Sequence, residues 1–232
     1  MRHFCVVLAT FVCVLLGGLA LAIAASTAAA DTRIGLVGGW SFSNLSIDGQ
    51  SGLEGRSSFA AGAVVDYGLD ERWGIRVEPT WMSRGGKATK RNAYWGSIDG
   101  VVFQLDCIDV PVLARYDLGT SADRGYLLGG LDVSFATKSE AKITQAHATE
   151  KVDFGDVFNP VDVGVDAGAG MAFDMGGDGR LGVDARFTYG LTNINGGGTV
   201  TYQGSPLDVP STSTHNYDFR LMATYFFPRA GK

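Results

Sequence analysis

Alternation between apolar and polar side chains recurs through this sequence, and it constrains the fold more than any other feature. In the segment from Tyr217 to Phe227, every second residue is apolar or aromatic, and the intervening residues include Asp218, Arg220 and Thr224. Successive side chains of a β-strand point to opposite faces, so this segment has one lipid-like face and one wet face. Seven further segments between residues 34 and 191 follow the same rule. The pattern predicts an all-β fold of about eight strands.

The connections between these segments alternate in length. The long ones span residues 44–57, 83–102, 137–160 and 193–216, and the short ones span 69–72, 118–124 and 175–179. Bacterial outer-membrane barrels have short periplasmic turns and longer external loops. The sequence therefore predicts a closed antiparallel transmembrane β-barrel, an up-and-down meander with both chain ends on the periplasmic side and its long loops outside the cell.

The N-terminal segment predicts export. Arg2 is followed by an apolar run from Phe4 to Ile23 and then by Ala28, Ala29 and Ala30. This arrangement is typical of a secretory signal peptide cleaved after a small-x-small site. We expect residues 1–30 to be removed and residues 31–232 to form one outer-membrane β-barrel domain. A retained membrane anchor is the alternative.

Charge and cysteine usage exclude several classes of function. The net charge is −5, whereas a nucleic-acid partner requires a basic face. Cleavage of the signal peptide leaves Cys107 as the only cysteine, which excludes an intramolecular disulfide. We expect no cofactor and no metal site.

The inward faces of the predicted strands carry most of the charge. A barrel of about eight strands has an interior filled by side chains, and buried charges must be paired or hydrated. We therefore predict an ion-pair network in the lumen, with a proton or ion path as the alternative. The network comprises Arg76, Glu78, Asp109, Arg115, Asp132, Asp162, Asp166, Asp184, Arg186, Asp218 and Arg220.

Two groups of residues could in principle be catalytic, and for neither do we predict a catalytic residue. Asp162 and Asp166 point the same way on one strand, but no substrate cleft is evident beside them. His147 or His215 could act with a loop serine in a lipid-modifying enzyme, although the sequence lacks a G-x-S-x-G elbow. The candidate serines are Ser139, Ser211 and Ser213.

Several strand motifs together resemble the outer-membrane β-barrel group that includes the PorT-type proteins. They are the opening strand with Trp40, Phe42 and Asn44, then residues 76–79, 108–113, 168–170 and 186–194. The resemblance implies an eight-stranded barrel inserted by the general outer-membrane assembly machinery, and it assigns no reaction. One departure is that Pro228 to Lys232 follow Phe227, where such barrels often end on an aromatic residue.

The sequence thus predicts a non-enzymatic, monomeric barrel in the cell outer membrane, surrounded by lipid, that contributes to envelope structure or surface interaction. An extracellular ligand could bind the long loops, which carry Tyr94 and Trp95, and the alternative is that these aromatic residues fold over the barrel mouth. A narrow pore for small solutes and a lipid-modifying enzyme are the alternatives. A soluble periplasmic barrel with an apolar ligand is a further alternative, but it would require an apolar lumen.

Overall fold

The computed structural model describes residues 32–48, 53–89, 99–145 and 148–228. The predicted signal peptide, His147, Tyr94 and Trp95 lie outside these residues. No helix within the described ranges is long and apolar enough to cross a membrane.

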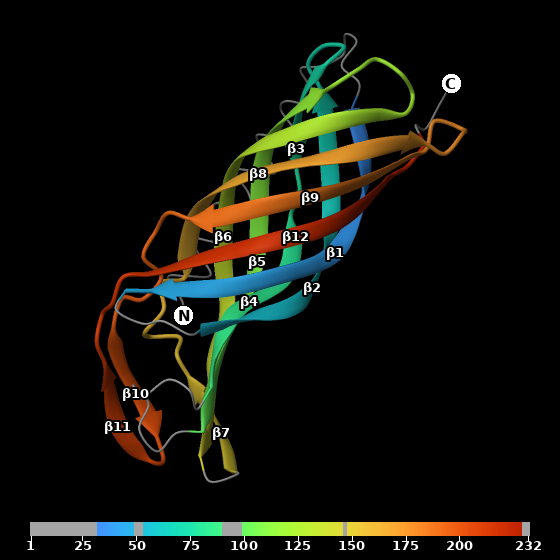
Figure 1. Ribbon diagram of the computed structural model, residues 1–232. Coiled ribbons are helices and arrows are strands. Elements are labelled where there is room, and N and C mark those ends of the chain that lie inside the picture. The colour runs from blue at the N-terminus through green and yellow to red at the C-terminus, as the bar shows by residue number, and fades with distance from the viewer. Residues whose placement is uncertain (1–31, 49–52, 90–98, 146–147, 229–232) are drawn as a thin grey trace.

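Antiparallel strands close into a ring with eight strand positions (Figure 1). We call each position a stave; a stave is one strand, except that one stave consists of two short strands. The ring closes where β1 pairs with β12, from Gly35 opposite Phe226 to Ile47 opposite Thr214. β3 and β4 both pair with β2 and with β5, so they form one stave interrupted at Glu78 and Pro79. In ring order the staves are β1 (Thr32–Ile47), β2 (Leu53–Gly68), β3 (Trp73–Val77) with β4 (Thr80–Thr89), β5 (Gly100–Asp117), β6 (Arg124–Gln145), β8 (Val161–Asp174), β9 (Arg180–Gly190) and β12 (Thr214–Phe226).

The two ends of the barrel differ. Short turns join β2 to β3, β5 to β6, and β8 to β9, and all three lie at the end where β1 begins and β12 ends. We call this the short-turn end. Beyond the opposite, long-loop end lie β7 (Ala148–Asp153), β10 (Gly198–Tyr202) and β11 (Ser205–Val209), as Figure 1 shows. The predicted meander is therefore confirmed, but the connection between β1 and β2 spans only residues 48–52 and is similar in length to the short turns.

Side-chain facing follows the predicted alternation. On β12, Leu221 is 46% exposed on the outer face, whereas Arg220 and Met222 are buried inside. Trp40 on β1 is 59% exposed and packs edge-on against Phe59 of β2. Large exposed apolar side chains are costly in water but suit a surface that contacts lipid.

The strands continue well beyond the lipid-facing part of the barrel, so the long loops are shorter than predicted. β4 extends to Thr89 and β5 begins at Gly100, inside the segment predicted as the loop 83–102. Residues 44–47 and 53–57 belong to β1 and β2. Likewise, residues 137–160 are mostly the end of β6 and its hairpin with β7, and residues 193–216 contain the β10–β11 hairpin.

The physical reason for these errors is an inversion of polarity along the strands. A bulge between Ala136 and Lys138 shifts the register of β6 against β5, and beyond it Ala141 and Ile143 face inward while Lys142 faces outward. Outside the bilayer the outer face meets water, so it becomes polar and the interior becomes apolar. The alternation persists with the opposite polarity, which makes the strand resemble a loop in sequence.

An apolar core consequently fills the long-loop end. Phe103 packs edge-on against Phe154 and Phe158, with ring centroids 5.9 and 6.1 Å apart. The same buried cluster includes Leu45, Val101, Ile143, Val157 and Ile194. The interior beyond the lipid-facing part of the barrel is thus apolar, whereas within that part buried charges lie beside two smaller apolar clusters.

Candidate functional site

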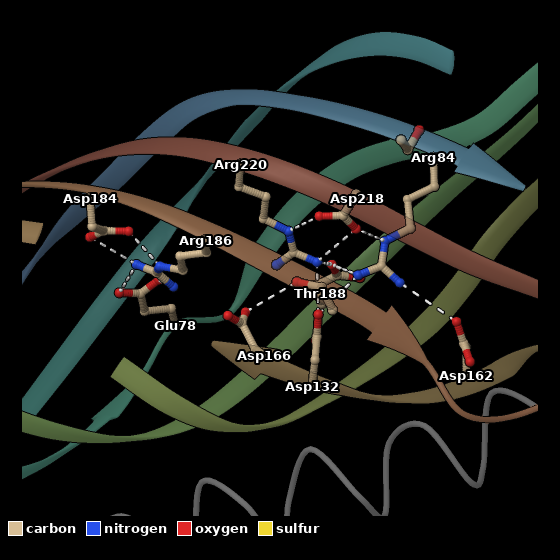
Figure 2. A network of polar contacts seen from close by, with 12 residues as sticks. Glu78, Arg84, Asp132, Asp162, Asp166, Asp184, Arg186, Thr188, Asp218 and Arg220 are labelled. Atoms are coloured by element: carbon tan, nitrogen blue, oxygen red, sulfur yellow. Dashed lines mark hydrogen bonds and ion pairs between the residues drawn. The ribbon is translucent and has the colours of Figure 1, made fainter. Parts of the chain in front are cut away.

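Two arginines lie at the centre of a buried charge cluster in the lumen, the Arg220 cluster (Figure 2). Arg220 donates through Nη2 to Oδ2 of Asp109 at 2.8 Å and to Oδ2 of Asp132 at 2.7 Å, and through Nε to Oδ1 of Asp218 at 2.6 Å. Arg84 donates to the same oxygens of Asp109 and Asp132 and lies 3.2 Å from Oδ2 of Asp218. β12 and β5 are opposite staves of the ring, so Arg220 and Asp109 bridge the lumen.

A second group, the Arg186 cluster, also crosses the lumen. Arg186 of β9 holds Glu78 through two parallel hydrogen bonds, Nη1 to Oε2 at 2.6 Å and Nη2 to Oε1 at 2.9 Å. This bidentate fork is the strongest geometry available to an arginine and a carboxylate. The Nε of Arg186 donates to Asp184 on its own strand. Glu78 interrupts the stave opposite β9, so the pair ties opposite walls together.

Arg76 connects the Arg186 cluster to apolar packing. It bonds Asp66 at 3.0 Å and lies 3.7 Å from both Glu78 and Asp184. Its guanidinium lies over the rings of Tyr126 and Phe226, at 4.9 and 5.4 Å from their centroids. Cation–π contacts of this kind strengthen when water is excluded.

Towards the short-turn end the ion pairs continue as a chain. Arg115 bonds Asp66 and lies 3.2 Å from Asp117, which also accepts a hydrogen bond from Arg124 at 2.7 Å. Paired charges therefore occupy the lumen from the Arg220 cluster to the short-turn end.

Glycines on β8 make room for these large side chains. A Cβ at Gly168 would lie 2.8 Å from Cγ of Arg186, and one at Gly170 would lie 2.6 Å from Cζ of Tyr126. Real Cβ atoms do not approach so closely. The inward glycines are thus part of the site, because they leave room on β8 for side chains of the two neighbouring strands, β9 and β6.

The structure brings together most of the residues predicted for the lumen network. Asp162 lies at its edge, 3.7 Å from Arg84, and accepts hydrogen bonds from Thr192 and Asn216. Asp166 accepts a hydrogen bond from Thr188 at 3.3 Å and makes no ion pair within 4.0 Å among the described residues. Asp162 and Asp166 therefore have separate partners and do not form a shared acid–base pair.

Sequence reasoning missed one central residue, Arg84, by assigning it to the external loop 83–102. The signal was present, because Arg76, Glu78, Thr80 and Met82 all face inward, and continuing that alternation reaches Arg84. Asp66, Asp117 and Arg124 were also absent from the predicted network.

Of the predicted serine–histidine combinations, the structure brings Ser213 and His215 together. Ser213 Oγ lies 3.2 Å from Nε2 of His215, and Nδ1 of that ring lies 3.1 Å from the carbonyl oxygen of Gly190. A carbonyl only accepts, so Nδ1 of the neutral ring carries the proton and Nε2 accepts from Ser213. Ser139 is buried, and Ser211 donates to the Asn195 carbonyl.

No group of three or more His, Cys, Asp or Glu side chains among the described residues is arranged to hold a metal ion. Cys107 is a free, buried thiol within the apolar core of the long-loop end.

Comparison with solved structures gives several similar chains, among them three outer-membrane proteins. Neisserial surface protein A shares 13% identity, with 86% of this chain and 100% of that chain covered and a TM-score of 0.44. Ail of Yersinia pestis shares 14% identity over 84% of this chain and 98% of that chain, with a TM-score of 0.40. OprG from Pseudomonas aeruginosa shares 12% over 85% and 96%, with a TM-score of 0.47. A protease, OmpT from Escherichia coli, is also among the similar structures.

Sequence comparison gives a family. No curated protein shows significant similarity to the chain. A family model described as an outer membrane protein beta-barrel domain matches residues 24–196, which is well over half of the sequence. The match does not test the PorT-type resemblance, which stays a prediction. Together with the closed eight-stave ring, it shows that this chain belongs to the outer membrane protein beta-barrel domain family and lies in the cell outer membrane.

Proposed function

We propose that the protein is a non-enzymatic structural element of the outer membrane, with a closed lumen and an ordered external surface for interaction. The observation that carries this proposal is the pair of arginine clusters that bridge opposite walls. Arg186 and Arg220 are 1% and 2% exposed, and each binds carboxylates from across the barrel. A solute could pass only if these ion pairs separated.

Hydrogen bonds hold the two hairpins at the long-loop end together. Tyr202 on β10 hydrogen-bonds Gln145 at the end of β6 over 3.0 Å, and the backbone N–H of Gln203 donates to Glu150 of β7 over 3.2 Å. These bonds join the β6–β7 and β10–β11 hairpins into one platform at the long-loop end. By the rule for bacterial barrels, this end faces the exterior. We further propose that the chain is a monomer in lipid, inserted by the outer-membrane assembly machinery.

Planar-bilayer recording of the purified full chain tests the closed lumen. We expect no steady conductance from the wild type. Large, reproducible single-channel steps would overturn the proposal and support the narrow pore instead. Five arginines and nine carboxylates are buried among the described residues, so such a pore would favour cations.

Surface labelling tests the orientation. An epitope inserted between Gln203 and Gly204, at the tip of the β10–β11 hairpin, should be labelled on intact cells. Labelling only after permeabilisation would place the platform in the periplasm and overturn its proposed role.

A lipid hydrolase is the second candidate, and the Ser213–His215 pair is the observation that favours it. Nε2 of His215 is placed to take a proton from Ser213 Oγ, as a general base does for a nucleophile. The third member of a triad is a carbonyl here, whereas a carboxylate would stabilise the protonated ring better. We expect no hydrolysis of phospholipid or lipopolysaccharide acyl esters by the wild type. Activity lost in Ser213→Ala and retained in Ser211→Ala would establish the hydrolase.

A further inference from the structure

An apolar cavity of about 360 Å³ lies in the long-loop end, between the barrel mouth and the β10–β11 hairpin. Its inner wall comes from the buried apolar core and includes Phe103, Ile143, Phe154 and Val157. Leu207 of the hairpin forms part of its outer wall. The cavity is separate in chemistry from the charged lumen, whose arginines do not line it.

The cavity has the size and lining of a small-molecule site. Ligand sites in proteins are typically about 300 to 1,000 Å³, mostly apolar, with a few polar groups that fix orientation. An unfilled apolar space of this size would forfeit packing contacts in proportion to its volume, so filling it is favourable. The lining residues with polar side-chain groups are Asn195, Tyr202, Asp208, Thr212 and Thr214.

From this geometry we propose that the cavity binds a small amphipathic molecule with an apolar body and a single hydroxyl or amine group. An apolar cavity of about 150 Å³ accommodates a benzene ring, so this volume fits a body of about ten carbon atoms. The edge-on arrangement of Phe103 against Phe154 and Phe158 offers ring faces and edges to an aromatic body. The ligand enters from the external medium, because the cavity lies beyond the lipid-facing strands.

Ser213 and His215 do not line this cavity, whereas their neighbours Thr212 and Thr214 do. Successive residues of a strand point to opposite faces, so the serine–histidine pair lies on the outside of the barrel wall. The proposed ligand would therefore not contact the Ser213–His215 pair, and we propose binding at this cavity without catalysis. The proposal does not depend on whether the lumen conducts.

The test uses 2-naphthol as the probe, with the full chain in lipid nanodiscs and methyl NMR as the readout. Methyl groups of Ile143, Val157 and Leu207 report on the cavity, and those of Val183 and Leu221 report on partitioning into lipid at the outer face. We expect saturable shifts at the cavity methyls. Shifts confined to the lipid-facing methyls, or shifts that do not saturate, would overturn the proposal.

A matched pair of variants sharpens the test. Val157→Phe places a ring in the cavity and should weaken 2-naphthol binding about tenfold or more. Val161→Phe makes the same change on the outer face of β8, where Val161 is 36% exposed, and should leave binding unchanged. Equal binding by Val157→Phe and the wild type would contradict the cavity as the site.

Photolabelling of the wild type covers the case in which Val157→Phe fails to fold. A naphthyl diazirine should label residues 154–158 or 198–209, and excess 2-naphthol should abolish that labelling. Labelling restricted to lipid-facing strands, unaffected by competitor, would overturn the proposal without any variant.

Discussion

Arg84 and Arg220 donate to the same carboxylate oxygen of Asp132, at 2.9 and 2.7 Å. The two guanidinium groups can share one acceptor because Asp109, Asp132 and Asp218 surround them with negative charge. The strand register adds a further repulsion, since Arg220 lies directly opposite Arg186 on β9. Like charges opposite each other destabilise a sheet, and here each arginine is compensated by an aspartate two residues earlier on its own strand.

Arg220→Ala should lower the thermal unfolding temperature markedly. The substitution leaves buried carboxylates without their partner, at a cost of about 3 to 5 kcal/mol where water is excluded. Heating series on a denaturing gel, where folded and unfolded barrels migrate differently, measure the transition. Lys151→Ala, which removes an exposed cation on β7, is the control and should have little effect. An unchanged transition for Arg220→Ala would mean that the lumen is hydrated enough to solvate the freed carboxylates.

Arg84→Ala should be comparably destabilising, whereas Lys87→Ala on the same strand should be nearly neutral. Arg84 is 2% exposed and paired, while Lys87 is exposed. Arg84 and Arg220 share acceptors, so each single variant keeps one arginine bonded to Asp109 and Asp132, and the double variant should lose more stability than the two single losses combined. Equal, small effects of Arg84→Ala and Lys87→Ala would instead support the loop assignment that the sequence suggested.

Leu221→Arg and Val183→Arg should each destabilise the barrel by about 2 to 4 kcal/mol if they lie near the bilayer midplane. Both side chains are 46% exposed on the outer face. Ala148 of β7 is exposed at the long-loop end, and Ala148→Arg should be tolerated because water, not lipid, surrounds it. Unfolding in urea with lipid vesicles distinguishes the three. Tolerance at all three positions would show that the outer face does not contact lipid.

The turn between β2 and β3 should show an acid-sensitive contribution from Asp70. The backbone N–H groups of Trp73 and Arg72 donate to Oδ1 of Asp70 at 2.7 and 2.8 Å, and they lower the pKa of this carboxyl. The unfolded pKa is about 3.9, so the stabilisation is present above that value and is lost as the pH falls through the lower, folded pKa. Carboxyl NMR should give a midpoint below about 3.9. A midpoint at or above the ordinary value would contradict the hydrogen-bonded turn.

The sequence by itself determined the strands that lipid surrounds. Residues such as Leu221 and Arg220 alternate there because each strand has one side in hydrocarbon and the other in a crowded polar lumen, and this contrast is readable one residue at a time. The short turns and the inward position of the charged residues followed from the same local rule.

Only the tertiary structure decided which charges meet. Arg186 contacts Glu78, and Arg220 contacts Asp109, because ring closure places opposite staves face to face. Strand periodicity carries no information about which residues face each other across the lumen. The length of the strands beyond the bilayer was hidden for a different reason. Past the bulge in β6, Ile143 faces inward and Lys142 faces outward, because the surroundings of the barrel change from lipid to water. The apolar core and its cavity form only when hairpins that are distant in the sequence pack together at this end.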